Sequence, residues 1–343
     1  MPPSALKARL GEGLRDFAWN EWAQMGLLAP ARRTSRWAQD PEALIVFTLE
    51  VARDDPRLFD ELLDWLLVNE SLLSARRLRA VCRDREDERL VDAALAWVAR
   101  QRPRAARRSR TPPRSHADGA PTPLFRGMTT PVRRPDPAFA AAGWLRPVAE
   151  PSGKARRPDL LTPIDFAFRL RELLGVGARA EVVRFLLTVE APSARTRVIA
   201  DSACFAKRNV HEALGALHAA GFVERWTVGN EQRHGIDRAK WTQLLGIAPD
   251  ELPAERPWPQ LLAGLRAVLR WLDRPDLDSL SDYLRASQAR DLLEAVRRDF
   301  EYAGVRVGTS PGTGAWSDLE ALVADALASL GVEPLTPVAP ERP

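Results

Sequence analysis

The sequence predicts a mainly α-helical protein that contains one short β-hairpin. Apolar residues recur at helical spacing over most of the first hundred residues, where no alternating strand pattern occurs. Two helices there should begin at Asp40-Pro41 and Asp55-Pro56, because Asp caps a helix and Pro fits its first turn. We therefore expect a helical N-terminal domain at residues 1–101, a central domain of helices and a hairpin at 159–245, and a helical C-terminal domain at 246–333.

Helical spacing also predicts the elements of the C-terminal domain. Two amphipathic stretches precede the last helix, in which Ser317 and Glu320 have the spacing of a capping box. Gly331 should end that helix, since glycine readily adopts the left-handed conformation that follows a helix. Residues 334–343 are expected to form a flexible tail.

The composition is that expected of a cytoplasmic protein. Hydrophobic residues make up 45% of the 343 residues, which is enough to bury a core. No run of about 18 apolar residues could span a membrane, and the first residues lack the apolar stretch of a secretory signal. Cys82 and Cys204 are the only cysteines, which argues against a disulfide framework and a cysteine-rich zinc site.

One segment gives the chain its net positive charge. Residues 102–158 hold 13 Arg or Lys residues against 3 Asp or Glu, and they are rich in proline. Such a composition predicts a solvated linker, which is either a plain tether between domains or a basic arm that lies on nucleic acid. Phe139, Trp144 and Leu145 could pin its second half onto a neighbouring domain.

The central domain begins with three predicted helices. Thr162 and Asp165 mark the start of the first helix, and Gly175 marks its end. A second helix follows with the apolar spacing of a core element. The third is short and is expected to bury Val198 and Ile199.

The fourth predicted helix is amphipathic and covers residues 206–220. On a helical wheel its apolar side carries Val210, Ala213, Leu214 and Leu217. The opposite side carries Arg208, Glu212, Gly215 and Ala219, with His211 on one flank. Gly221 should end the helix, after which Phe222 and Val223 are expected to return to the core.

A β-hairpin follows this helix. The segments "VERWTV" and "QRHGI" flank Gly229 and Asn230, which both tolerate the positive φ of a tight turn. Three helices followed by a two-stranded wing form a winged helix. The pattern Ile199-Ala200, Val210, Leu214, Leu217, Gly221-Phe222-Val223 and Arg225 resembles the helix-turn-helix and wing of MarR- and ArsR-like bacterial transcription regulators over roughly residues 177–237.

The resemblance implies sequence-specific binding of double-stranded DNA by a homodimer on two half-sites. In place of the family's small hydroxyl residues, the recognition helix begins with Ala206 and three polar residues, and Cys204 replaces a turn glycine. Arg208 is the best candidate for a base contact, because arginine can bond guanine with two hydrogen bonds. The expected DNA-binding residues are Arg195, Thr196, Arg197, Lys207, Arg208, Asn209, His211, Glu212, Arg225 and Arg233.

Two other interpretations stay open. The central module carries 8 basic and 7 acidic residues over 177–237, a weaker surplus than DNA-binding domains usually show. The chain could be an antitoxin-like or defence-linked regulator that binds a cognate protein. It could also be a protein-interaction scaffold whose winged helix does not bind DNA.

Enzymatic chemistry has no support in the sequence. The glycine-rich stretch at residues 307–316 lacks the Lys-Ser/Thr ending of a phosphate-binding loop. His211 and His218 could share a helix face, but no acidic or cysteine residue stands at metal-ligand spacing. We expect no catalytic residue, no metal and no cofactor.

Overall fold

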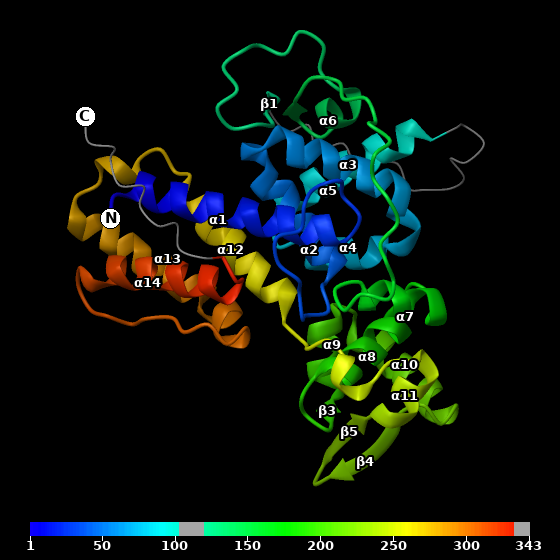
Figure 1. Cartoon of the computed structure of the whole chain (residues 1–343). Helices are drawn as coiled ribbons and strands as arrows, with labels where there is room; N and C mark the ends of the chain where they lie inside the picture. The colour runs from blue at the N-terminus through cyan, green and yellow to red at the C-terminus, as the bar shows by residue number, and fades with distance from the viewer. Residues whose placement is uncertain (103–119, 333–343) are drawn as a thin grey trace. The chain divides into compact units, whose positions relative to one another are not determined.

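The computed structural model describes residues 1–102 and 120–332, and most of these lie in helices (Figure 1). The helices are α1 (Pro3–Gln24), α2 (Pro41–Val51), α3 (Pro56–Asn69), α4 (Ala75–Val81), α5 (Arg85–Gln101), α6 (Pro137–Ala141), α7 (Phe166–Leu174), α8 (Ala178–Thr188), α9 (Thr196–Ala203), α10 (Lys207–Ala219), α11 (Arg238–Leu245), α12 (Trp258–Leu272), α13 (Asp282–Tyr302) and α14 (Gly314–Ser329). The strands are β1 (Thr122–Pro123), β2 (Trp144–Leu145), β3 (Ala194–Arg195), β4 (Glu224–Val228) and β5 (Glu231–Gly235). The prediction of a mainly α-helical protein is confirmed.

The chain forms two compact units. Of the described residues, one unit contains 1–18 and 260–332, and the other contains 19–102 and 120–259. These boundaries differ from the domain ends expected from sequence at 101 and 245. The expected C-terminal tail, 334–343, lies outside the described residues.

In the first unit, α13 and α14 lie side by side (Figure 1). The start of α1 belongs here because its apolar residues pack against the C-terminal helices. At Gly13 the approach is so close that an added Cβ would lie 2.6 Å from Leu327 Cδ2. The predicted capping box at Ser317 and Glu320 is wrong, since α14 already begins at Gly314.

The N-terminal helices of the second unit begin as predicted. Asp40 accepts a hydrogen bond from the Ala43 amide at 2.9 Å, and Asp55 accepts one from the Leu58 amide at 3.1 Å. Every residue of α2 is buried. This helix therefore forms the centre of the helical group α2–α5 rather than one face of it.

Residues 120–147 are partly buried, unlike the solvated linker expected there: Leu124, Phe125, Asp136 and most of 138–146 are buried, whereas 120–123 and 133–135 are exposed. Phe139 and Trp144 are buried, as their apolar character suggested, whereas Leu145 is half-buried. Arg146 is also buried, with its guanidinium 5.1–5.5 Å from the ring centres of three phenylalanines. The most arginine-rich stretch of the predicted linker, 103–119, lies outside the described residues.

Residues 160–252 share one hydrophobic core, built mainly by α7, α8, α9, α10 and α11. Strands β3, β5 and β4 form an antiparallel sheet in that order. A two-residue turn joins β4 to β5, with Gly229 at φ +60° as predicted. The positive φ that was also expected at Asn230 is wrong. Figure 1 shows this hairpin projecting from the helices.

The apolar side of α10 is buried as predicted, at Val210, Ala213, Leu214 and Leu217. Two other core predictions in this region are wrong. Val198 is 39% exposed, because the short helix α9 turns Ile199 and Ala200 toward the hydrophobic core instead. Phe222 is 42% exposed and lies against the ring of Trp241, with ring centres 5.4 Å apart.

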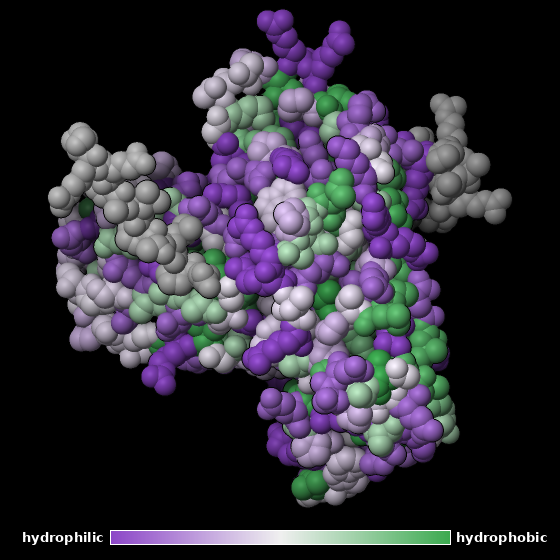
Figure 2. Space-filling model, viewed as in Figure 1, coloured by the Kyte–Doolittle hydropathy of each residue, from purple (hydrophilic) through white to green (hydrophobic). Residues whose placement is uncertain are grey.

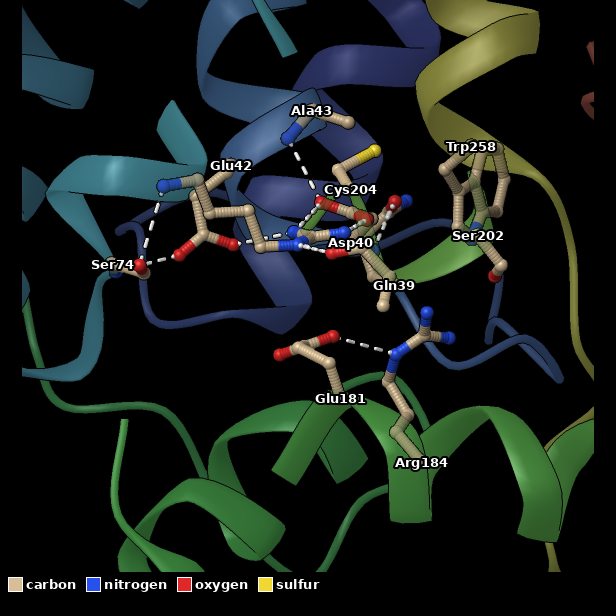
Figure 3. A network of polar contacts seen from close by, with 12 residues as sticks. Gln39, Asp40, Glu42, Ala43, Ser74, Glu181, Arg184, Ser202, Cys204 and Trp258 are labelled. Carbon is tan, nitrogen blue, oxygen red and sulfur yellow. Dashed lines mark hydrogen bonds and ion pairs between the residues drawn. The ribbon is translucent and has the colours of Figure 1, made fainter. Parts of the chain in front are cut away.

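A buried ionic network joins the N-terminal helices to this core. Its seven side chains come from five segments of the second unit. Figure 3 shows Asp40 and Glu42 on one side, with Glu181 and Arg184 of α8 on the other. The acidic members are Asp40, Glu42, Glu181 and Glu255, and the basic members are Arg77, Arg171 and Arg184. Arg171 alone bridges Glu42 and Glu181, both at 2.7 Å, and so ties α7 and α8 to α2.

The network lowers the pKa of two of its carboxyl groups, those of Asp40 and Glu181, and so favours their charged forms. Burial opposes ionisation of Glu181, but Arg171, Arg77 and Arg184 together place the pKa of this carboxyl well below its usual range. Burial likewise opposes the charge on Arg77, but Asp40, Glu181 and Glu42 together outweigh it, so the pKa of this arginine is raised. The charges are thus stable only as a set.

Asp165 provides a test of burial at the start of α7. Its side chain is buried, and its Oδ2 accepts a hydrogen bond from Thr162 Oγ1 at 3.1 Å, while Oδ1 has no partner among the described residues. Burial raises the pKa of Asp165 from 3.8 to about 8. Its contribution to stability is therefore complete below about pH 4 and is lost as the pH rises through about 8.

Asp165→Asn should raise the melting temperature relative to wild type more at pH 8.5 than at pH 5. Equal differences at both pH values would contradict the raised pKa, and Asp250→Asn, at an exposed site, is the control.

Leu217 tests the packing of α10. It is 6% exposed, so Leu217→Ala should lower the free energy of unfolding by about 2–5 kcal/mol through the cavity it leaves. The matched control is Leu244→Ala on α11, where the side chain is 56% exposed and the expected change stays within about 0.5 kcal/mol. Urea unfolding followed by tryptophan fluorescence measures both, and equal effects would show that α10 is packed differently.

Candidate nucleic-acid interface

Helix α10 presents a polar side to solvent. Lys207, Arg208, His211 and Glu212 are exposed, because the apolar residues between them turn toward α8 and α9. The structure thus brings four of the five predicted contact residues of this helix onto one accessible face. Lysine, arginine and histidine side chains can donate to base edges and to phosphates, whereas the Glu212 carboxylate can only accept.

Asn209, the fifth, is half-buried beside the face. It lines a shallow cavity of about 370 Å³ together with Glu212, Arg179 and the turn between α7 and α8. Its amide is therefore less accessible than the side chains of Lys207 and Arg208.

The start of α9 brings three more predicted residues near the sheet. Arg195 and Arg197 are exposed, but Thr196 is half-buried and its hydroxyl lies 3.1 Å from His234 Nε2. Burial and the nearby Arg225 lower the pKa of His234, which favours a neutral ring at this contact. Thr196 therefore holds strand β5 and is less available to a ligand than the two arginines.

The hairpin carries the last two predicted residues. Arg225 on β4 is exposed, and Arg233 on β5 is half-buried between Arg195 and Trp226, its partners on the two neighbouring strands. The Nε of Arg233 has no hydrogen-bond partner among the described residues. Trp226 is 37% exposed, and the sequence analysis did not single it out. Its position opposite Arg233 follows from the strand register, which the sequence alone does not fix.

Acidic residues lie between the basic ones on this surface. Three predicted arginines form ion pairs within the module: Arg208 with Glu212 at 2.9 Å, Arg195 with Glu231 at 2.6 Å and Arg197 with Asp201 at 3.9 Å. These pairs are solvent-exposed, so each contributes little to stability. They explain why the module is nearly neutral, and a phosphate could replace the carboxylates at small cost.

The surface of this region also contains apolar side chains. Figure 2 shows hydrophobic residues interspersed with hydrophilic ones over the region of α7–α11. Phe222 and Leu244 border a shallow cavity of about 350 Å³ above Trp241, and both are exposed. Lys240 and Gln243 also line this cavity, so the apolar area has polar side chains beside it.

Cys204 occupies the turn between α9 and α10. It adopts φ +52° and ψ +41°, the only left-handed conformation of a non-glycine residue in the described part of the chain. This explains why glycine is common at the turn position that the sequence resemblance identified. Burial raises the pKa of the Cys204 thiol to about 11, which suppresses the reactive thiolate.

The described residues contain neither a metal-binding cluster nor a membrane-spanning helix. No group of three His, Cys, Asp or Glu side chains with metal-binding geometry occurs within 1–102 and 120–332. No helix in these ranges combines the length and the apolar character that crossing a bilayer requires. The exposed polar face of α10 with the neighbouring hairpin is therefore the feature that we consider for function.

The strain at Cys204 can be measured with two substitutions that both remove the thiol. Cys204→Gly should give a free energy of unfolding about 1 kcal/mol higher than Cys204→Ala, because only alanine retains the left-handed penalty. At Ala216, an exposed position inside α10, substitution by glycine should instead cost about 1 kcal/mol. Equal stabilities of the two Cys204 variants would contradict the left-handed turn.

Comparison of the chain with protein-family models, curated proteins and solved structures finds no significant match. The function is therefore inferred from the residues themselves. The decisive group is the exposed side of α10, the arginines at the start of α9, and the hairpin with Arg225 and Arg233.

Proposed function

We propose that residues 177–237 form a winged helix that binds double-stranded DNA, and that the chain is a bacterial-type transcription regulator. The observation that carries the proposal is the polar face of α10, which exposes Lys207, Arg208 and His211 beside a projecting hairpin. A helix of this kind fits the major groove of B-DNA, where side chains of its first turns reach base edges.

The order of the elements supports this function. Helix α8, strand β3, helices α9 and α10, and strands β4 and β5 follow one another as in the winged helices that the sequence resembles. The edge strand β3 pairs with β5, which places the start of α9 next to the hairpin. Arg195 and Arg197 would then meet the phosphates that flank the groove, and Arg225 and Arg233 would meet the neighbouring backbone or the minor groove.

Such regulators act as homodimers on two half-sites one helical turn apart, and we propose the same for this chain. Binding would occur in the cytoplasm, where the DNA of a bacterium lies. The polar contacts would set the register, and Arg208 would read a base, with guanine as its preferred partner.

A protein partner is the second candidate, and one observation favours it. Phe222 and Leu244 are exposed and border an apolar area above Trp241. In addition, three arginines of residues 177–237 are already paired with carboxylates. An antitoxin-like regulator could bind a cognate protein there while α10 binds DNA. A pure scaffold would bind protein only, so DNA binding separates the two.

Arg208 and Glu212 provide the test. Duplexes are first selected from a random library with the full chain, and affinity is then measured by fluorescence anisotropy. Arg208→Ala should weaken binding to a selected duplex by about 1–3 kcal/mol and relax the preference at one base pair. Glu212→Gln should strengthen binding of selected and random duplexes roughly 2- to 5-fold, because it removes a negative charge and frees Arg208.

The matched control is Arg298→Ala, which removes an exposed arginine from α13 and should leave both affinities unchanged. Failure of the wild-type chain to select any duplex at low salt would contradict DNA binding. Unchanged affinity of both α10 variants would show that DNA meets another surface.

A further inference from the structure

The turn that precedes α10 is bonded to the N-terminal helices through Arg77. This arginine of α4 is fully buried, and its Nε donates a hydrogen bond to the carbonyl oxygen of Ala203 at 2.8 Å. Ala203 is the last residue of α9, and α10 begins at Lys207. The remaining donors of the guanidinium bond Asp40 and Glu42 of the buried network. A residue 126 positions away in sequence thus fixes the backbone of the turn.

The end of α9 is held from a second side by Glu255. Its Oε1 accepts a hydrogen bond from Ser202 Oγ at 2.9 Å, and its Oε2 accepts one from Arg184 Nη1 at 2.6 Å and one from Thr188 Oγ1 at 2.8 Å. Figure 3 shows Ser202 and Cys204 close to Asp40 and to the helix that carries Arg184. Two consecutive residues of the turn region, Ser202 and Ala203, therefore take their partners from outside α9 and α10.

The geometry of the turn requires such support. Cys204 stands in the left-handed region, which costs a non-glycine residue about 1–2 kcal/mol. Strained backbone of this kind persists where surrounding contacts over-determine it. Only three residues separate Ala203 from α10, so a change at the carbonyl of Ala203 would reorient Lys207 and Arg208.

We propose that Arg77 and Glu255 are positioning residues for the polar face of α10, so that the N-terminal helices control how closely this face fits DNA. The inference rests on the proposed DNA-binding function and adds its regulation. A change in the N-terminal helices that shifts α4 would act on DNA recognition through the Arg77–Ala203 bond, although α4 carries no residue of the candidate interface.

Arginine is required at position 77 for a chemical reason. Its planar guanidinium bonds Asp40, Glu42 and the Ala203 carbonyl at the same time. A lysine ammonium is a single point charge and has too few directed donors to span all three. Arg77→Lys therefore keeps the positive charge in the network while it releases the turn.

Arg171→Lys is the matched control. Arg171 is equally buried, bonds the same Glu42 and donates to a backbone carbonyl, that of Leu72, at 2.8 Å. Its hydrogen-bond partners among the described residues lie on α2, α8 and the segment after α3, and none of them belongs to the α9–α10 turn. Both variants should lose similar stability, and only Arg77→Lys should affect the turn.

Two measurements on the full chain test the proposal. Hydrogen exchange should become at least tenfold faster at the amides of residues 204–210 in Arg77→Lys and stay unchanged there in Arg171→Lys. Affinity for a duplex selected by the wild-type chain should fall at least tenfold in Arg77→Lys, while affinity for a random duplex changes less than twofold. A purely structural role predicts the same exchange pattern and the same affinities in both variants, and that result would overturn the proposal.

Ser202→Ala covers the case in which Arg77→Lys does not fold. It removes the single hydrogen bond from the Ser202 hydroxyl to Glu255 and should produce the same selective changes to a smaller degree. Unchanged exchange and unchanged discrimination in Ser202→Ala would then overturn the proposal. If the wild-type chain selects no duplex, the proposed function fails, and the exchange data alone decide whether Arg77 holds the turn.

Discussion

The buried ionic network is the constraint on which the second unit depends. Arg77 and Arg171 join carboxylates of α2 to α7, α8 and the end of α9, all without access to solvent. Removing one member of such a set leaves an uncompensated buried charge, which typically costs about 3–5 kcal/mol. Because Arg77 and Arg171 each bond more than one segment, the N-terminal helices and the core of residues 160–252 form one cooperative structure.

This arrangement gives the candidate DNA-binding face a stable base. The face itself is formed by short elements with exposed side chains, and its own ion pairs are weak. Its placement instead comes from the strained turn at Cys204, held by Arg77 and Glu255. Rigid supporting contacts of this kind let a small set of exposed residues keep a defined geometry for a ligand.

The surface charges suggest how selectivity could arise without a strongly basic module. Arg208 and Glu212 neutralise each other on the outer side of α10, so long-range attraction to DNA is modest there. Close fit then contributes more to discrimination than charge does. The apolar area at Phe222 and Leu244 leaves room for a protein partner beside the DNA-facing side.

Much of the fold could be predicted because it depends on local patterns. The caps at Asp40 and Asp55, the buried side of α10 and the hairpin turn at Gly229 follow from residue type and spacing, which act over a few residues. Spacing along the chain likewise places five predicted basic residues on the exposed sides of their elements: Arg195, Arg197, Lys207, Arg208 and Arg225.

Only the tertiary structure decided the contacts between distant segments. Arg77 lies in a helix with several other arginines, and nothing in its neighbourhood in sequence marks it as the buried one. The exposure of Phe222, the grouping of residues 1–18 with the C-terminal helices and the register that places Trp226 opposite Arg233 depend on long-range packing. The sequence by itself determined which elements form and which sides they bury, since those are local properties. Which buried charges meet was decided by the tertiary structure, because a charge is stable in the core only where its partners arrive from elsewhere in the chain.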